Sequence, residues 1–470
     1  MFFRGLPGFL AVLAALVLAG GCTSSGSSQT AVAAAAQSGP LPRDIEQLVG
    51  RVYRDTEVEA MVSRVGHRLV TRAGVPGNYR FLVLDQPVAN AHAIPTGYVF
   101  VTRGLLALMD DEAELAAAIS HELGHIVERH AAQREQQRRS VMDAAVDAAM
   151  KSGSITVGRS VARDGLVKLR RYSRDQELQA DAIGVSYLIK AGYRGDAMTS
   201  LIEKLRLQSR LEEQLMGLGE NREPSALSTH PGADDRLVAL RGLPAARSDG
   251  ETGRAAYLAA IDGMSVDDPP DEGFVRGPRF LHPTMRIGFV APRDFRLYND
   301  HDGVLGVGSD RSLLYFSCQS GNVQGRLDDW MRNRLQPTPT DIQATEIGGA
   351  EAAIGARPRG SDTGLGQVRY VLIRRPDGIC YFNLMSDGPD RDRRINALVE
   401  ATRSFRDLPV AEAAALRPYR LRLVPGSTPA AALAARFPYP DLKMERLLTL
   451  NGVTDAAALA QHDRVKIIEP

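Results

Sequence analysis

The stretch of this chain that most restricts its fold is "AAISHELGHIVERH", residues 117–130, where His121 and His125 stand four residues apart and Glu122 follows the first histidine. Side chains four apart on a helix lie on one face, so the two imidazoles can converge on one point. The small apolar run before them predicts that this helix is buried. Buried polar side chains need partners. The stretch therefore belongs in the core of a folded domain.

This spacing is also the minimal geometry of a catalytic metal site. Zn²⁺ takes His nitrogens readily and can leave one position open for water. Glu122 lies one step round the helix from His121, beside the metal, where a general base for the attacking water must stand. The alternative is a surface helix that happens to carry these three residues. The sequence predicts one Zn²⁺ per chain, with His121 and His125 as ligands and Glu122 as the base.

A third ligand is available in "ELQAD", which places Glu177 and Asp181 four residues apart on a later helix. Glu177 would complete a His-His-Glu set. Asp181 would stand behind a ligand histidine and fix its tautomer. Taken alone, the two carboxylates fit a solvated helix face; beside the histidine motif, the metal interpretation is favoured.

The two motifs together resemble the gluzincin endopeptidases of the CAAX-prenyl-protease and HtpX type, above all their periplasmic, β-barrel-assembly-enhancing branch. The resemblance spans about 41–243. It implies a zinc endopeptidase that cleaves unfolded or misassembled envelope proteins. The tetratricopeptide repeats of that branch are not visible here, so its partner docking is not carried over.

The resemblance also covers "NAHAIPTGYVFVTRGLL", which implies an edge strand that binds an extended substrate peptide through Asn90, Tyr98 and Val99. His92 stands where the family more often has a bulky apolar residue, and we expect it to serve packing rather than metal binding.

"STHPGADDR" resembles the family's loop bearing His-Pro and a downstream arginine, here His230 and Arg236. Three roles are open for His230: a surface residue, a hydrogen-bond donor to the oxyanion, or a plug that occupies the open zinc position. The resemblance favours the plug, with Arg236 helping to hold the loop.

The N-terminus has the pattern of a signal peptide: an early cation, an apolar run over 9–19, small residues, then Cys22. It resembles a bacterial lipobox, which implies lipidation of Cys22 and anchoring on the periplasmic side of the outer membrane. Plain secretion with an incidental cysteine is the alternative. The run after Cys22 is small and polar and is typical of a flexible tether.

Pattern and composition predict an α+β multidomain protein with a mainly helical zincin-type domain and a small β-sheet. The predicted order is a signal peptide (1–21), a tether (22–40), the zinc metalloprotease domain (41–243), a linker with one short helix (244–278), an α/β accessory domain (279–408) and a βααβ domain (416–470).

The accessory domain loosely resembles the PsbP-type sandwich, and we interpret it as an interaction module. The last domain resembles a LysM module, which implies peptidoglycan as a partner; a small capping domain without a ligand is the alternative. Cys318 and Cys380 lie in strand-like runs and could pair in an oxidising periplasm. Two buried free thiols are the other possibility.

Three local expectations concern the helices. One long helix is predicted over 110–140, with Asp111 as its N-cap and Glu114 as the capping-box partner. A loop or hinge is predicted over 151–165, where the helical pattern breaks. A further helix over 174–193 should close at Gly192.

The net charge of +1 gives no reason to propose nucleic acid as a partner. Two functions other than proteolysis are compatible with the sequence. One is a chaperone-like or scaffold envelope lipoprotein with a structural or gated zinc site; the other is a cell-wall binder. The intact Glu122 favours the protease.

Overall fold

The computed structural model describes residues 40–152, 154–216, 230–300, 302–357, 366–388 and 390–470. The predicted signal peptide, Cys22 and most of the tether lie outside these residues. Within the described part of the chain, no helix is both long and apolar enough to cross a membrane.

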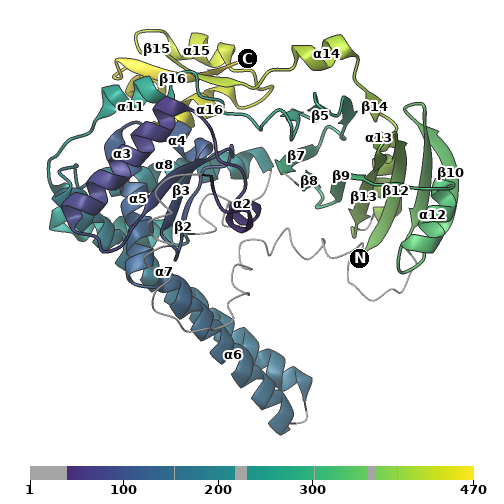
Figure 1. Cartoon of the computed structure of the whole chain (residues 1–470), viewed down its shortest axis with the longest axis horizontal. Coiled ribbons are helices and arrows are strands. Elements are labelled where there is room, and N and C mark those ends of the chain that lie inside the picture. Colours follow the sequence, from purple (N-terminus) through teal and green to yellow (C-terminus); the bar gives the residue numbers. More distant parts are fainter. Residues whose placement is uncertain (1–39, 153, 217–229, 301, 358–365, 389) are drawn as a thin grey trace.

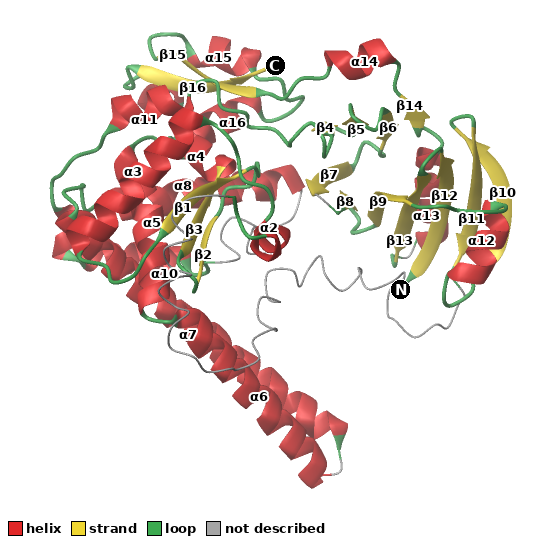
Figure 2. Cartoon of the chain, in the orientation of Figure 1, coloured by secondary structure: helices red, strands yellow, loops and turns green. Residues whose placement is uncertain are grey.

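The first half of the chain is a helical unit built around a three-stranded sheet (Figures 1 and 2). The strands follow the order β1-β3-β2, with β1 parallel and β2 antiparallel to β3. The elements are α2 (Arg43–Val49), α3 (Thr56–Ala73), β1 (Arg80–Leu84), β2 (Ala91–Ile94), β3 (Tyr98–Thr102), α4 (Arg103–Leu108), α5 (Glu112–Val127), α6 (His130–Ser152), α7 (Ile155–Lys190), α8 (Ala197–Met216) and α10 (Ala233–Gly242).

The predicted edge strand is wrong in part. Tyr98 and Val99 lie on β3, which is hydrogen-bonded on both sides, and they are 6% and 0% exposed. A tight turn with Gly97 at a φ of 95° folds β2 back onto β3, so β2 becomes the edge. Asn90 directly precedes this edge strand. The sequence predicted that these residues form strands, but it did not predict the order of the strands in the sheet.

Helix α5 runs through the centre of this unit, and every residue from Glu112 to His125 is buried. Asp111 caps it as predicted, since its carboxylate accepts from the Glu114 backbone N–H at 2.8 Å. The Glu114 carboxylate, however, accepts from the backbone N–H of Asp110 at 2.7 Å instead of from the cap residue.

The predicted single helix over 110–140 is two helices. Helix α5 ends at Val127, and Arg129 takes a left-handed φ of 56° before α6 starts at His130. A residue other than glycine in this region of backbone space is uncommon and marks a sharp local turn. The chain therefore changes direction a few residues after the second motif histidine.

The loop predicted over 151–165 is also wrong. Apart from residue 153, it forms the adjoining ends of α6 and α7, an antiparallel pair that projects from the unit (Figure 1). Gly165, which weakened the helical pattern, lies against α6: a Cβ there would stand 2.3 Å from the Val141 side chain. The glycine thus serves close helix packing. Helix α7 ends at Lys190, close to the predicted end at Gly192, and this glycine has a φ of 83°.

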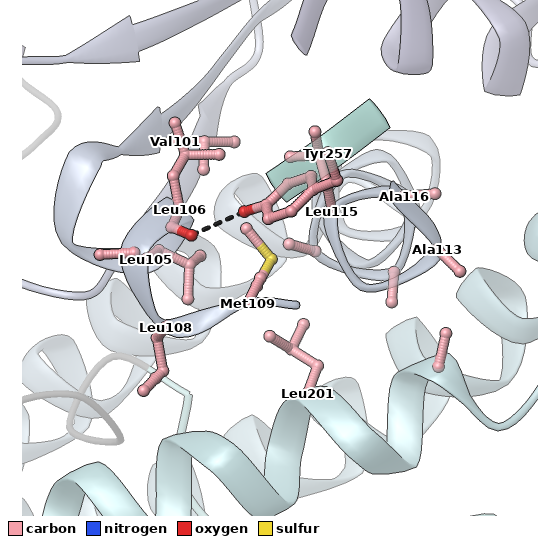
Figure 3. Packing of buried hydrophobic residues seen from close by; sticks show 14 of the residues in the cluster. Val101, Leu105, Leu106, Leu108, Met109, Ala113, Leu115, Ala116, Leu201 and Tyr257 are labelled. Atoms are coloured by element: carbon pink, nitrogen blue, oxygen red, sulfur yellow. Dashed lines mark hydrogen bonds between the residues drawn. The ribbon is translucent and has the colours of Figure 1, made fainter. Parts of the chain in front are cut away.

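Apolar side chains from several elements meet around the start of α5 (Figure 3). Leu115 lies among Leu106, Met109 and Leu201. The hydroxyl of Tyr257, on the linker helix α11 (Arg254–Ile261), donates to the carbonyl of Leu106 at 2.6 Å. The short helix predicted in the linker is therefore present and packs against the core.

A β-rich region follows, starting at Phe274. It holds a four-stranded sheet, β14-β6-β5-β4, and a seven-stranded antiparallel sheet, β10-β11-β12-β13-β9-β8-β7. Its elements are β4 (Phe274–Arg276), β5 (Arg279–His282), β6 (Ile287–Val290), β7 (Phe295–Asp300), β8 (Gly303–Gly308), β9 (Leu313–Ser320), α12 (Leu327–Arg334), β10 (Thr340–Ile347), β11 (Ala350–Ala356), β12 (Gln367–Arg375), β13 (Gly378–Ser386), α13 (Arg391–Thr402), β14 (Arg406–Asp407) and α14 (Val410–Ala415).

Cys318 and Cys380 are bonded to each other in this region. They stand directly opposite on β9 and β13, with their Cα atoms 4.0 Å apart. Of the two possibilities left open by the sequence, the structure has the disulfide.

The C-terminal unit consists of β15 (Arg420–Pro425), α15 (Ala430–Arg436), α16 (Lys443–Leu450), α17 (Ala456–Leu459) and β16 (Arg464–Glu469). The two strands pair antiparallel with the helices between them, as predicted, and α17 is an additional short turn of helix. The unit shares one apolar core with the first half of the chain. In Figure 1 it lies over α4 and α11.

Lys466 fastens this unit to the first half of the chain. Its side chain is 1% exposed. Its ammonium donates to the carbonyls of Ala107, Leu108 and Met109 at 2.8–3.0 Å and lies 2.8 Å from the Asp110 carboxylate. A cation at the carbonyl end of α4 also complements the helix dipole.

Asp268, in the linker before β4, gives a prediction about pH. Burial, with the neighbouring Asp267 charge, raises its pKa to about 8. At about pH 4 and below, the carboxyl is protonated in both the folded and the unfolded protein, and its burial costs little. As pH rises from about 4 to 8, the unfolded protein releases this proton more readily than the folded one, so the free energy of unfolding falls. Asp268→Asn should therefore be more stable than wild type at pH 8, by at least about 1 kcal/mol, and about equal at pH 4. Thermal unfolding across this range measures the difference; parallel curves for the two proteins would contradict it.

Candidate metal centre

The centre lies where α5 crosses α7. Gly124, inside the histidine motif, permits the crossing: a Cβ there would come within 3.1 Å of the Ala180 carbonyl on α7. A larger residue there would require the backbone of α7 to shift. The close approach brings His121 and His125 of α5 up to Glu177 and Asp181 of α7.

Four donor atoms converge, from His121, His125, Glu177 and His230, all within 4.8 Å of one another. The Nε2 atoms of His121 and His125 are 3.0 Å apart, and each lies 3.2–3.4 Å from a Glu177 oxygen. The donors of a tetrahedral Zn²⁺ with bonds near 2.0–2.1 Å are separated by about 3.3 Å. The spacing of the side chains therefore fits a small tetrahedral cation.

The chemistry of these atoms also calls for a cation. The Nδ1 of His121 lies 2.8 Å from an Asp181 carboxylate oxygen, which can only accept, so this nitrogen carries the proton. The Nε2 atom then carries no proton, and its lone pair faces the Glu177 carboxylate. Without a metal, a proton must take its place: burial and Arg236 oppose protonation of His121, but Asp181 and Glu177 outweigh them and raise its pKa to about 9.

Asp181 is held rigidly by Arg236, which is 3% exposed. Two guanidinium nitrogens donate to the two carboxylate oxygens at 2.7 Å. Burial opposes ionisation, yet this guanidinium and His121 lower the pKa of Asp181. The carboxylate therefore stays ionised behind His121, the position that the sequence predicted for it.

His230 occupies the fourth corner of the donor set. Its Nδ1 lies 3.2 Å from the His121 Nε2 and 2.9 Å from a Glu177 oxygen. Its Nε2 lies 3.4 Å from the Glu122 carboxylate. Arg236 contacts the backbone of the same residue, donating to the His230 carbonyl at 3.4 Å. The imidazole thus stands between the predicted metal ligands and the predicted base, and the surface role left open for it is not what the structure has.

Glu122 points to this centre without joining the four converging donors. Its burial raises its pKa, although His230 and His121 act in the opposite direction. A carboxylate beside a metal site is the kind of group that can accept a proton from water and return it. A small cavity lies beside it, lined mainly by apolar side chains that include Met198, Leu201 and Leu205 of α8.

The other predicted residues are placed as follows. Asn90 lines the same cavity, so the residue before the edge strand does face the centre. His92, on β2, stacks on Phe100 with ring centroids 5.1 Å apart and is not among the converging donors, as expected. His130 also reaches the centre and was not among the predicted residues: its Nδ1 lies 2.8 Å from that of His125. Its place at the end of the motif stretch was the available signal.

The geometry agrees with comparisons to known proteins. The model of peptidase family M48 matches residues 56–243. This segment is similar to the peptidase domains of that family. A β-barrel assembly-enhancing protease of Escherichia coli K12 is 29% identical over 212 residues, which are 42% of this chain and 41% of that one. The same-named protein of Yersinia pestis is 30% identical over 195 residues, 38% and 37% of the two chains.

The mitochondrial metalloendopeptidase OMA1 of Schizosaccharomyces pombe is 31% identical over 199 residues, covering 41% of this chain and 55% of that protein. The chain thus spans about half the length of the curated relatives it matches. The M48 match and the names of the relatives support the predicted enzyme class, a metalloendopeptidase. The predicted likenesses of 279–408 and 416–470 lie outside the matched segment and stay predictions.

Proposed function

We propose that this chain is a zinc-dependent endopeptidase of the bacterial periplasm that hydrolyses peptide bonds of unfolded or misassembled envelope proteins. The observation that carries the proposal is the convergence of His121, His125 and Glu177 with Glu122 beside them. Zn²⁺ held by the first three would polarise the scissile carbonyl and activate the attacking water. Glu122 takes the proton of that water and delivers it to the leaving amine. Cleavage of casein by the purified, zinc-loaded protein, and its loss with a chelator, tests the proposal.

The substrate chain would add to the free edge of β2 as an extended strand. This mode reads backbone rather than side chains, which suits unfolded chains of varied sequence. The apolar cavity beside Glu122 would receive an apolar side chain next to the cleaved bond.

His230 would act as a plug in this function. With its ring bridging the ligand set and Glu122, substrate and water cannot take the fourth position. His230→Ala should raise basal proteolysis by several-fold, with self-cleavage as a further sign. Casein turnover and zinc content measure this together. A rate at or below wild type, with zinc still bound, would overturn the plug role. A lower rate would mean that the imidazole assists the reaction instead.

Anchoring through Cys22 is a separate part of the proposal, resting on the lipobox pattern alone. In Cys22→Ala, the protein should stay unprocessed or leave the membrane fraction. Fractionation of cells expressing this variant decides it, and normal processing with membrane retention would refute lipidation. A murein pull-down tests peptidoglycan binding by 416–470.

A chaperone-like or scaffold lipoprotein is the second candidate, favoured only by His230 filling the fourth corner. It predicts zinc binding without cleavage, both in wild type and in His230→Ala.

A further inference from the structure

His130 is the first residue of α6 and is 0% exposed. The left-handed turn at Arg129 aims its ring back at α5, five positions behind in the sequence. The Nδ1 atoms of His130 and His125 then lie 2.8 Å apart. Local backbone strain of this kind persists only where the surrounding structure holds it, and it gathers at functional sites.

The direction of the hydrogen bond between the two rings follows from the metal site. His125 can offer its Nε2 lone pair to a cation only if its Nδ1 carries the proton. His125 therefore donates, and the Nδ1 of His130 accepts. The proton of His130 must then be on Nε2, and that atom lies 3.2 Å from the amide oxygen of Gln179, which accepts.

The chain of bonds ends on a charge. The amide nitrogen of Gln179 donates to the Glu128 carboxylate at 2.8 Å. Every link then runs the same way, from His125 through His130 and Gln179 to the anion at Glu128. An amide can donate at one end while accepting at the other, so the polarity of the whole chain is consistent.

We propose that His130 is a positioning residue that holds His125 in the tautomer able to bind the metal. This inference rests on the proposed function. The two ligand histidines are thus supported differently: His121 directly by the Asp181 carboxylate, His125 by a neutral ring. Partners that orient metal-binding histidines commonly change metal affinity by about ten- to a hundredfold when lost.

The test compares zinc affinities by competition with a chelator. His130→Leu removes the acceptor and should weaken zinc binding by about ten- to a hundredfold. His130→Asn can place an amide oxygen near the position of the lost Nδ1 and should stay within about threefold of wild type. His282→Leu is the matched control: it removes another buried histidine, on β5 outside the metal centre, and should leave zinc affinity unchanged.

Equal zinc affinities for wild type and His130→Leu would overturn the inference. So would a tenfold or larger loss in a natively folded His130→Asn, because the role would then be shape and not hydrogen-bond acceptance. If His130→Leu does not fold, His130→Ala takes its place with the same expected loss, and equal affinities for wild type and His130→Ala would overturn the inference. If wild type itself binds no zinc, the proposed function fails, which is a different result.

Discussion

Glu122→Gln should lower casein cleavage by about a hundred- to ten-thousandfold while leaving about one zinc per chain. Glutamine keeps the size of the side chain but cannot take a proton from water. The zinc content should survive because Glu122 stands outside the converging donors from His121, His125, Glu177 and His230. Peptide release and metal analysis on the same preparation give both numbers.

Variants of the proposed ligands supply the contrast. His121→Ala, His125→Ala and Glu177→Ala should each lose metal and activity together, since each removes a donor from the set. Glu122→Gln should lose activity alone. Full cleavage by Glu122→Gln would show that the assigned mechanism is wrong, whatever the metal content.

Lys466→Met should destabilise the protein by about 3–5 kcal/mol, the usual cost of breaking a buried charge pair from one side. The ammonium makes three hydrogen bonds to carbonyls at the end of α4 and an ion pair with Asp110. Methionine fills a similar volume but leaves these carbonyls buried and unpaired. Asp110 keeps two partners, Lys204 at 2.8 Å and Arg254 at 3.4 Å, so the local structure should loosen rather than collapse.

Urea unfolding followed by circular dichroism measures this loss. Lys443→Met is the matched control in the same unit, because its ammonium makes a single backbone contact at 3.4 Å; it should change stability by less than about 0.5 kcal/mol. An unchanged urea midpoint for Lys466→Met would mean that the contacts of Lys466 with α4 and Asp110 do not stabilise the protein. Because α4 leads directly into α5, we also expect weaker zinc binding in this variant.

The convergence of the donor side chains was predictable because it rests on local periodicity. The spacing from His121 to His125, and from Glu177 to Asp181, places each pair on one helical face in any fold that keeps the helices. Residue chemistry then points to a cation. The structure added only that Gly124 lets the two helices come close enough for the pairs to meet.

The order of the strands in the sheet and the ends of the helices were harder to predict from the sequence. Tyr98 belongs to a strand, as its pattern indicates, but being central or at the edge depends on the pairing of β1, which comes from elsewhere in the chain. Gly165 looks like a helix breaker until α6 is seen packed against it. In each case the contact that decides the structure is made by residues distant in the sequence. Such contacts routinely override the intrinsic helix or strand propensity of the local sequence.

Sequence by itself determined the donor types and their faces, because both depend on spacings of a few residues. Only the tertiary structure decided what those donors meet. His230 reaches the fourth corner from a separate loop, His130 reaches His125 through one left-handed residue, and Lys466 reaches the end of α4 across more than half of the chain. These contacts form because buried polar groups must find partners, and which partner is in reach is settled only when the whole chain has packed.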